Sequence, residues 1–535
     1  MTAAPGPEPT FDLDLYLSLP RVAGLVLAPD GGRLVTSVAT PGPDGKKFTS
    51  ALWELDPGGQ AAPRRLTRSA PGEANAAFLP DGSLLFTSTR EDPEAAPDAK
   101  PDDEVARLWL LPADGGEARP VAASPAGIDL LRVARDAGTV VWRTAVHPGA
   151  DDLEADQRRD KARSDAGVSA LLFETYPIRY WDHYLGPREP RLFASAPPPA
   201  DGRMAPGRPL TPAPGRALDE QDVAVTPDGA TVLCGWDTGE VTNPRSRLVA
   251  IDVASGERRV LLDDPGSSVG RIACSPDGRL AVCERIGHGD PDRPIDVGLW
   301  LVDLDSGEGR DLLAGLELWP QEPVWAPDSR AVFFAADENG RTPVFRVEVG
   351  GADDGRVTRL SADGAFSDLC PAPDGRRLYA LRATMAAPAE AVALDAAAAA
   401  ADQRPAPLPT PGLPLQVPGS LAEVETRAGD GTRLRGWLVL PSGASPARPA
   451  PLVVFIHGGP LSSWSAWSWR WNPWLLAARG YAVLLPDPAL STGYGQGFVG
   501  RGRGRWGAEP FSDLMALVDA ADAVAEVDGE RTAAM

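Results

Sequence analysis

Short apolar segments alternate with tight-turn sequences over the first three quarters of the chain. The turn is Pro-Asp-Gly or a near copy of it, and its seven copies lie at residues 28–31, 79–82, 135–138, 226–229, 275–278, 326–329 and 372–375. Proline presets the first turn angle, aspartate can bond the backbone that follows it, and glycine accepts a positive φ. Each copy therefore predicts a hairpin between two strands.

A second apolar pattern recurs further along each repeat. It is clearest at residues 52–56, 108–111, 248–252 and 299–303, and weaker at 344–345 and 392–395. Four short strands in a repeat of about 50 residues make one blade of a β-propeller, and a blade cannot bury its faces without neighbours. Seven turns predict an all-β, seven-bladed β-propeller over residues 21–395, after an N-terminal segment 1–20. Eight blades is the alternative.

The interval between the third and fourth turns is nearly twice as long as the others, yet it holds one strand of the second pattern, at 191–193. We therefore expect an insertion at about 150–190 within the third blade. It opens with a charged stretch, predicted to be a solvated helix. In the following residues 176–183, Arg179, Asp182 and His183 stand among aromatic side chains. This group could bind a ligand, but a strand with a polar outer face is the favoured interpretation.

The pattern changes after the seventh repeat. Residues 396–419 are Ala-rich and then Pro-rich, with a period of neither 2 nor 3.6, which predicts a linker. The elements predicted beyond it are a hairpin at 424–440, strands at 452–456 and 481–485, and helices at 472–479 and 511–525. Continuous apolar runs are typical of parallel strands that are buried on both faces. Residues 420–535 are therefore predicted to form an α/β domain, with Ser512 as the N-cap of its second helix.

Candidate chemistry follows the first of these buried strands. The segment His457-Gly458-Gly459-Pro460 stands where α/β-hydrolases place the backbone donors of their oxyanion hole. Glycines at this point let backbone N–H groups approach a developing alkoxide. A second glycine-rich segment, Ser491-Thr492-Gly493-Tyr494-Gly495, follows the next strand.

Together with the repeats, these two segments make the chain resemble the prolyl oligopeptidase family of serine peptidases, most closely its acylaminoacyl-peptidase-like branch. The resemblance covers nearly the whole chain. It implies that the propeller caps an α/β-hydrolase domain and admits peptides, but not folded proteins, to a Ser-Asp-His triad. It also implies that Gly459, with Gly458 beside it, supplies an oxyanion-hole N–H. Ala489-Leu490 stands where the family usually has Arg-Gly.

The nucleophile of such an enzyme lies in Gly-x-Ser-x-Gly, directly after the fifth strand. No such motif follows His457, and the formal match at 266–270 lies between two propeller strands and is attributed to chance. No histidine follows His457 either, and His457 itself is disfavoured as the triad base because the family's histidine follows the last strand. We expect only the N-terminal half of the hydrolase domain in these residues, without a triad and inactive alone. An incomplete sequence is favoured over an evolved pseudoenzyme.

Five tryptophans crowd the segment after the glycine loop. Among them, Trp464, Trp467 and Trp469 are candidates to line an apolar substrate pocket together with Tyr494. Packing between the two domains is the other use of these side chains, and it is slightly favoured.

Composition and charge narrow the function classes. A net charge of −22 with no Lys/Arg run argues against nucleic acid as a partner. No apolar run reaches the roughly 18 residues that a membrane span needs. Residues 1–10 lack the features of a secretory signal, so we expect a cytoplasmic protein. The four cysteines lack C-x-x-C spacing, which predicts buried thiols and no metal, and no cofactor is expected.

The function that the family resemblance implies is hydrolysis of short peptides by a serine-type peptidase. A non-catalytic propeller that binds or scaffolds a partner is the alternative. An esterase on the same fold is disfavoured, because small esters need no propeller lid.

Overall fold

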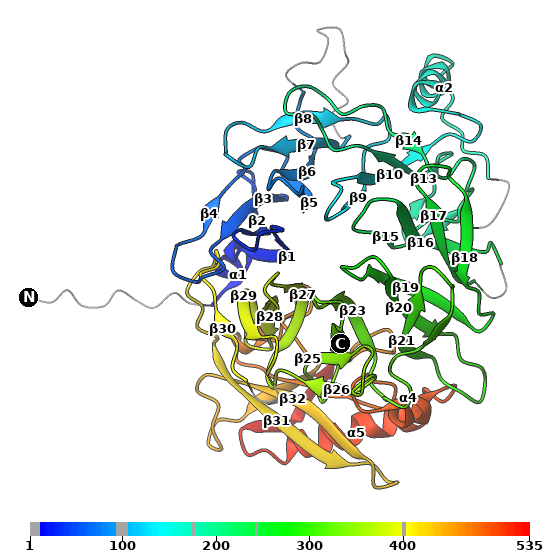
Figure 1. The fold of residues 1–535 in the computed structure, drawn as a ribbon. Coiled ribbons are helices and arrows are strands. Elements are labelled where there is room, and N and C mark those ends of the chain that lie inside the picture. Colours follow the sequence, from blue (N-terminus) through cyan, green and yellow to red (C-terminus); the bar gives the residue numbers. More distant parts are fainter. Residues whose placement is uncertain (1–10, 93–104, 174–176, 241–243, 399–402) are drawn as a thin grey trace, which may run out of the picture.

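A ring of seven four-stranded antiparallel sheets surrounds a central opening in the computed structural model (Figure 1). The model describes residues 11–92, 105–173, 177–240, 244–398 and 403–535. The first strand of each sheet lies nearest the centre, so the sheets are the blades of a propeller. The prediction of seven blades is confirmed, and the alternative of eight is wrong.

The strands of the blades follow one another in chain order, except in the third blade. Blade 1 has β1–β4 (Arg21–Leu27, Leu34–Pro41, Phe48–Leu55, Arg64–Arg65), blade 2 has β5–β8 (Glu73–Phe78, Leu84–Ser88, Arg107–Leu111, Arg119–Ala122), and blade 3 has β9, β10, β13 and β14 (Leu130–Val133, Val140–Val146, Glu189–Ser195, Arg208–Pro209). Blade 4 has β15–β18 (Val223–Val225, Thr231–Asp237, Ser246–Asp252, Arg258–Leu262), and blade 5 has β19–β22 (Ser267–Cys274, Leu280–Gly287, Asp296–Asp303, Gly309–Asp311). Blade 6 has β23–β26 (Pro320–Trp325, Ala331–Ala336, Val344–Glu348, Val357–Arg359), and blade 7 has β27–β30 (Ala365–Pro371, Arg377–Thr384, Ala387–Asp395, Ala406–Pro407).

All seven predicted turns join the first and second strands of a blade. Their fourth residue adopts a positive φ, as at Gly31 (75°) and Gly229 (70°), which is why glycine recurs there. Ser329 takes the same conformation (60°) in the one copy that lacks glycine. The second apolar pattern falls on the third strand of each blade that shows it, because that strand is sandwiched between two others.

The segment between β10 and β13 holds a helix, α2 (Leu153–Asp165), and a small hairpin of β11 (Arg179–Tyr180) and β12 (His183–Tyr184). Tyr176, the first residue of the predicted ligand-binding group, lies outside the described residues. The helix is mostly exposed, as expected, but Asp156 on it is fully buried. Its carboxylate accepts a hydrogen bond from the backbone amide of His147 at 2.7 Å and contacts His147 Nδ1. This contact fastens the insertion to the end of β10.

Seven apolar clusters lie between adjacent blades and form the core of the ring. One of them joins blade 1 to blade 7 through buried side chains that include Leu25, Leu34, Tyr379 and Leu381. Because both faces of every blade are covered in this way, the ring is closed by apolar packing.

Carboxylates link successive blades around the central opening. The first strands of several blades are bulged, and the bulge exposes backbone amides. The amide of Ile272 donates to Asp222 at 2.8 Å, that of Glu322 to Glu284 at 3.0 Å, and that of Asp368 to Glu322 at 2.9 Å. Each carboxylate belongs to the blade before the amide that it accepts from, so blades 4 to 7 are linked in series.

The C-terminal α/β domain is a five-stranded mixed sheet in the order β31-β32-β34-β33-β35. Its strands are β31 (Gly419–Arg427), β32 (Arg433–Pro441), β33 (Ala450–Val454), β34 (Ala482–Asp487) and β35 (Val527–Ala534), and its helices are α3 (Trp474–Ala477), α4 (Gln496–Gly502) and α5 (Glu509–Asp522). The strand β33 is parallel to both β34 and β35. In Figure 1 this domain lies beside blades 5 to 7.

Two details differ from the sequence-based expectation. The strand β30 pairs with β29 although it lies in the segment predicted to be a linker, because two residues are too few to show a period. The helix α5 begins at Glu509 with Ala508 as its N-cap, so Ser512 is not the cap. Pro510 fits the first turn, where no amide donor is needed, and the Ser512 hydroxyl bonds the Glu509 carbonyl instead.

All four cysteines are free; Cys234 and Cys283 are buried, and Cys274 and Cys370 are half-buried. Among the described residues, no helix is both long and apolar enough to cross a membrane.

A pH-dependent stability test follows from the carboxylate links. Burial raises the pKa of Glu284, so the folded state binds its proton more tightly than the unfolded state. Stability from this group is therefore present at low pH and is lost as pH rises through the folded pKa. We expect the thermal midpoint of wild type to gain more than that of Glu284→Gln when pH falls from about 7 to about 5. The exposed control Glu308→Gln should follow wild type, and parallel profiles for Glu284→Gln and wild type would contradict the argument.

Candidate active site

The glycine loop 457–460 lies just beyond the carboxyl end of β33. Because β33 and β34 are parallel, with Val454 beside Leu484, the segments that follow them meet at one edge of the sheet. The amide of Thr492 donates to the Ser462 carbonyl at 3.1 Å, which joins the two segments directly. The two glycine-rich segments predicted to be functional are therefore in contact.

The loop presents backbone donors to its surroundings. Gly458 and Gly459 are exposed, and no described residue accepts a hydrogen bond from either amide. Gly459 has φ of 126°, and a Cβ there would lie 3.0 Å from the Leu461 nitrogen, so the position requires glycine. Two exposed N–H groups without acceptors, held on a constrained backbone, can bind a negatively charged oxygen.

Asp487, at the end of β34, holds the segment after the glycine loop in place. Its side chain is fully buried and accepts from the Tyr494 hydroxyl at 2.6 Å, the Ser463 hydroxyl at 2.8 Å and the Trp464 amide at 3.1 Å. Burial raises the pKa of Asp487, and the hydrogen bonds lower it. The sequence patterns did not single out this residue, although it directly follows a buried apolar strand.

His457 is close to both Ser491 and Asp487. Its Nε2 lies 2.9 Å from Ser491 Oγ and 3.8 Å from Asp487 Oδ1. The single hydroxyl proton of Ser491 is donated to the Pro488 carbonyl at 2.7 Å, so Ser491 Oγ accepts from His457 Nε2–H.

This arrangement differs from a catalytic triad in two ways. In a triad the histidine accepts the serine proton, and the carboxylate bonds the other ring nitrogen. Here one ring nitrogen of His457, Nε2, faces both Ser491 and Asp487. In addition, the Ser491 side chain is fully buried. The geometry therefore favours a structural role for His457.

The Ser491–Gly495 segment also binds the propeller. The Thr492 hydroxyl donates to Asp337 at 2.6 Å, and the Asn339 amide donates to the Gly493 carbonyl at 3.0 Å. A Cβ at Gly493 would lie 2.9 Å from the Asp337 backbone, so glycine is needed for this close approach. The connection between β24 and β25 of blade 6 thus supports the edge of the sheet that carries the glycine loop.

Ala489-Leu490, which stands where the family usually has Arg-Gly, is held in place by packing and by a neighbouring ion pair. Leu490 adopts a φ of 84°, a conformation that normally favours glycine. Its side chain is buried and packs against Gly502, where a Cβ would come within 2.4 Å of it. Nearby, Arg501 pairs with the buried Asp513, which also accepts from the Ala489 amide at 2.9 Å. Packing and this ion pair therefore hold the segment in place.

The tryptophans lie in the environment of an interdomain core. Trp464 and Trp467 are buried in a cluster with Phe11 and Tyr16, next to the N-terminal helix α1 (Leu13–Ser18). The Tyr16 hydroxyl donates to the Trp469 carbonyl at 2.7 Å. The Tyr494 hydroxyl is occupied by Asp487, so this packing corresponds to the second use that the sequence left open for these residues.

A serine–histidine contact also occurs in the propeller motif attributed to chance. Ser268 Oγ in β19 lies 2.8 Å from His288 Nε2, a contact that the sequence did not predict because His288 lies 20 residues later, just after β20. No described residue bonds His288 Nδ1, which lacks the carboxylate of a triad. Within the described part of the chain, no cluster of three or more histidine, cysteine or acidic side chains could hold a metal.

A stability prediction tests the role of Asp487. Tyr494→Phe removes one donor to a buried carboxylate, at a cost of about 1.5 to 3 kcal/mol. The Trp464 amide, which bonds the same carboxylate, should then exchange its hydrogen about 10- to 150-fold faster through local opening. Hydrogen exchange of peptides that cover residues 457–470 measures this rate. Tyr481→Phe, on an exposed tyrosine, should leave it unchanged, and unchanged exchange in Tyr494→Phe would contradict the assignment.

Comparison with known proteins gives the sequence relatives of this chain. Residues 467–535 match the model of the prolyl oligopeptidase family. Dipeptidyl-peptidase 5 of Porphyromonas endodontalis is 24% identical over 527 residues, which cover 95% of this chain and 71% of that protein. Dipeptidyl-peptidase 5 of Aspergillus fumigatus is 26% identical over 386 residues, covering 65% of this chain and 52% of that protein. The chain thus matches about half the length of this fungal relative.

The fold is shared with solved peptidase structures. Acylaminoacyl peptidase of Pyrococcus horikoshii superposes with a TM-score of 0.73 at 14% sequence identity, over 98% of this chain and 74% of that one. At this identity the similarity concerns the fold alone. The resemblance inferred from the sequence motifs is confirmed by the family-model match over residues 467–535 and by the dipeptidyl-peptidase 5 relatives of the chain.

Proposed function

We propose that this chain provides the propeller and the oxyanion-hole loop of a serine-type peptidase that hydrolyses short peptides. The exposed amides of Gly458 and Gly459, at the carboxyl edge of a parallel strand, are the observation that carries the proposal. They would donate to the oxygen of the tetrahedral intermediate as its charge develops. The C-terminal sheet would then be part of an α/β-hydrolase domain, and the family match supports this interpretation.

The propeller would act as a lid that selects for size. Apolar packing closes the ring between blades 1 and 7, and carboxylates link blades 4 to 7 in series, so the ring would not open easily to admit a folded protein. Short peptides are therefore the substrate class that fits. The names of the sequence relatives, dipeptidyl-peptidases, make dipeptide-releasing substrates the first to assay.

Residues 1–535 on their own are proposed to be inactive. His457 Nε2 donates to Ser491 Oγ, so this pair cannot start an attack by removing the serine proton. In the proposed enzyme the nucleophile and its histidine would come from outside these residues. A binding or scaffold protein that uses only the propeller remains the second candidate, and the absence of a triad arrangement at Ser491 favours it over a complete hydrolase within this chain.

An activity-based label decides between these functions. The protein purified from its native source is treated with a fluorophosphonate probe, and its intact mass and labelled peptide are determined. We expect a mass above 56.3 kDa and a labelled serine outside residues 1–535. A mass of 56.3 kDa without a label would overturn the peptidase and support the binding protein.

The recombinant chain 1–535 serves as the matched control. It should take up no label and should release no dipeptide from dipeptidyl coumarin amides. Labelling of Ser491 that disappears in His457→Ala would refute the proposed inactivity and would assign these two residues to catalysis.

A further inference from the structure

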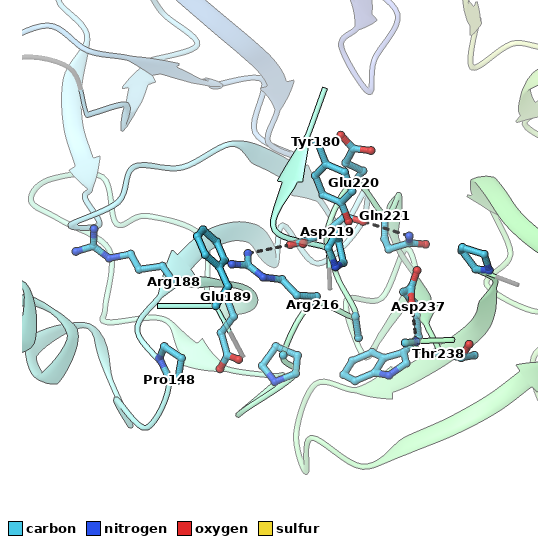
Figure 2. A pocket seen from close by; sticks show the side chains of 18 of the residues that line it. Pro148, Tyr180, Arg188, Glu189, Arg216, Asp219, Glu220, Gln221, Asp237 and Thr238 are labelled. Carbon is cyan, nitrogen blue, oxygen red and sulfur yellow. Dashed lines mark hydrogen bonds and ion pairs between the residues drawn. The ribbon is translucent and has the colours of Figure 1, made fainter. Parts of the chain in front are cut away.

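A cavity of about 800 Å³ lies beside the insertion in blade 3 (Figure 2). Three connections build its walls: the insertion between β10 and β13, the segment between β14 and β15, and the segment between β16 and β17. The side chains that line it include Phe173, Tyr180, Asp219, Glu220, Trp236, Asp237 and Thr238.

The cavity opens on the propeller face that carries the α/β domain. Strands in a blade are antiparallel, so connections from the second to the third strand, and from the fourth strand to the next blade, share one face. The α/β domain binds such connections in other blades: Trp474 Nε1 donates to the Met385 carbonyl, and Trp319 Nε1 donates to Gln496. The cavity is formed by connections of the same kind in blades 3 and 4. A peptide that reaches the glycine loop can therefore extend toward it.

Negative charge gathers at one side of this cavity. Figure 2 shows Tyr180, Asp219, Glu220 and Asp237 along that side. Burial, and then the charges of Asp219, Glu220 and Asp237, raise the pKa of Tyr180 to about 12, so all three carboxylates act on one phenol. Among the described residues Glu220 and Asp237 form no ion pair, and Asp219 has one distant pair, with Arg216 at 3.6 Å. Arg188 and Arg216 also line the cavity, and each already pairs with aspartate, Arg188 with Asp156 and Asp160 and Arg216 with Asp219. Glu220 and Asp237 therefore carry the charge that no described ion pair neutralises.

Two buried oxygen atoms of the cavity wall have no hydrogen-bond partner. Asp219 is only 8% exposed, and its Oδ2 is bonded by no described residue. The same holds for Oγ1 of Thr238. A buried carboxylate oxygen without a donor costs free energy, which a donor from a ligand would recover.

The wall also contains aromatic and apolar side chains. Phe173, Tyr180 and Trp236 line the cavity together with several prolines. An aromatic face attracts a cation and also accepts the methylene stem that carries it. Carboxylates combined with aromatic rings suit an organic cation on an apolar stem, and a cavity of this volume accommodates a long side chain.

We propose that this cavity is an exosite that binds the basic side chain, lysine or arginine, of a peptide held at the candidate active site. The inference rests on the proposed peptidase function, and it assigns that function a preference for basic peptides. Asp219 accepts from the cation, Glu220 and Asp237 contribute charge, and Trp236 and Phe173 contact the stem. The Thr238 hydroxyl completes the polar contacts.

Isothermal titration of the chain with blocked peptides tests this site without any hydrolysis. The probe is acetyl-Gly-Gly-Arg-Gly-Gly-amide, and its matched control has citrulline, which is neutral and nearly isosteric, in place of arginine. We expect the arginine peptide to bind at least about tenfold more tightly than the citrulline peptide, because a charge-assisted hydrogen bond is lost. Equal binding of the two peptides would overturn the proposal.

Variants locate the site within the protein. Asp219→Asn should weaken binding of the arginine peptide at least about tenfold, and Asp201→Asn, on an exposed loop residue, should leave it unchanged. Glu220→Gln changes an exposed residue and should weaken binding even if Asp219→Asn does not fold. Binding that is insensitive to both cavity variants would overturn the site.

A third peptide distinguishes whether the cavity binds a basic side chain or the free N-terminus of a peptide. Unblocked pentaglycine amide carries only the α-ammonium group, and we expect no binding that depends on Asp219. Tight, Asp219-dependent binding of this peptide would replace the proposed ligand by a peptide N-terminus. Peptide binding is measured without hydrolysis, so a negative binding result would reject the exosite and would not bear on the peptidase. A negative fluorophosphonate result would reject the peptidase and would leave the measured peptide binding unchanged.

Discussion

Apolar packing between adjacent blades is the interaction on which the rest of this structure depends. A single four-stranded sheet of this size has two faces to bury, and only a neighbour on each side can cover them. The chain meets this requirement seven times, and the last cluster brings Leu25 and Leu34 of blade 1 against Tyr379 and Leu381 of blade 7. Since the first and last blades are far apart in sequence, the closure of the ring places Leu25 and Leu34 beside residues more than 340 positions later.

Closure of the ring also fixes where the C-terminal sheet can lie. Asp487 bonds the segment that follows the sheet's glycine loop. Blade 6 bonds the neighbouring Ser491–Gly495 segment through contacts of Thr492 and Asn339. Neither contact is made by the loop's own amides, which leaves the N–H groups of Gly458 and Gly459 available. A rigid support with unpaired donors is the condition under which backbone amides stabilise a developing charge, because no reorganisation is needed.

Features set by local sequence could be predicted, and features set by distant partners could not. The Pro-Asp-Gly turns determine their own conformation, so they gave the number of blades correctly. The glycine loop was found because a strand pattern directly precedes it. The burial of Asp156, the pairing of β30 and the grouping of Asp219 with Tyr180 depend on contacts between different elements, and no periodicity records them. Leu490 is a further case: nothing local indicates a left-handed leucine, and its packing against Gly502 stabilises it.

The position of the helix α1 has a consequence for synthesis on the ribosome. Tyr16 bonds the carbonyl of Trp469, a residue 453 positions later, and Phe11 packs in the same cluster. At translation rates of about 5 to 20 residues per second, its partner emerges roughly half a minute to a minute and a half after the helix. During this interval the apolar face of α1 lacks its final cover while all seven blades are being made. The helix α1 is thus synthesised early and docked late.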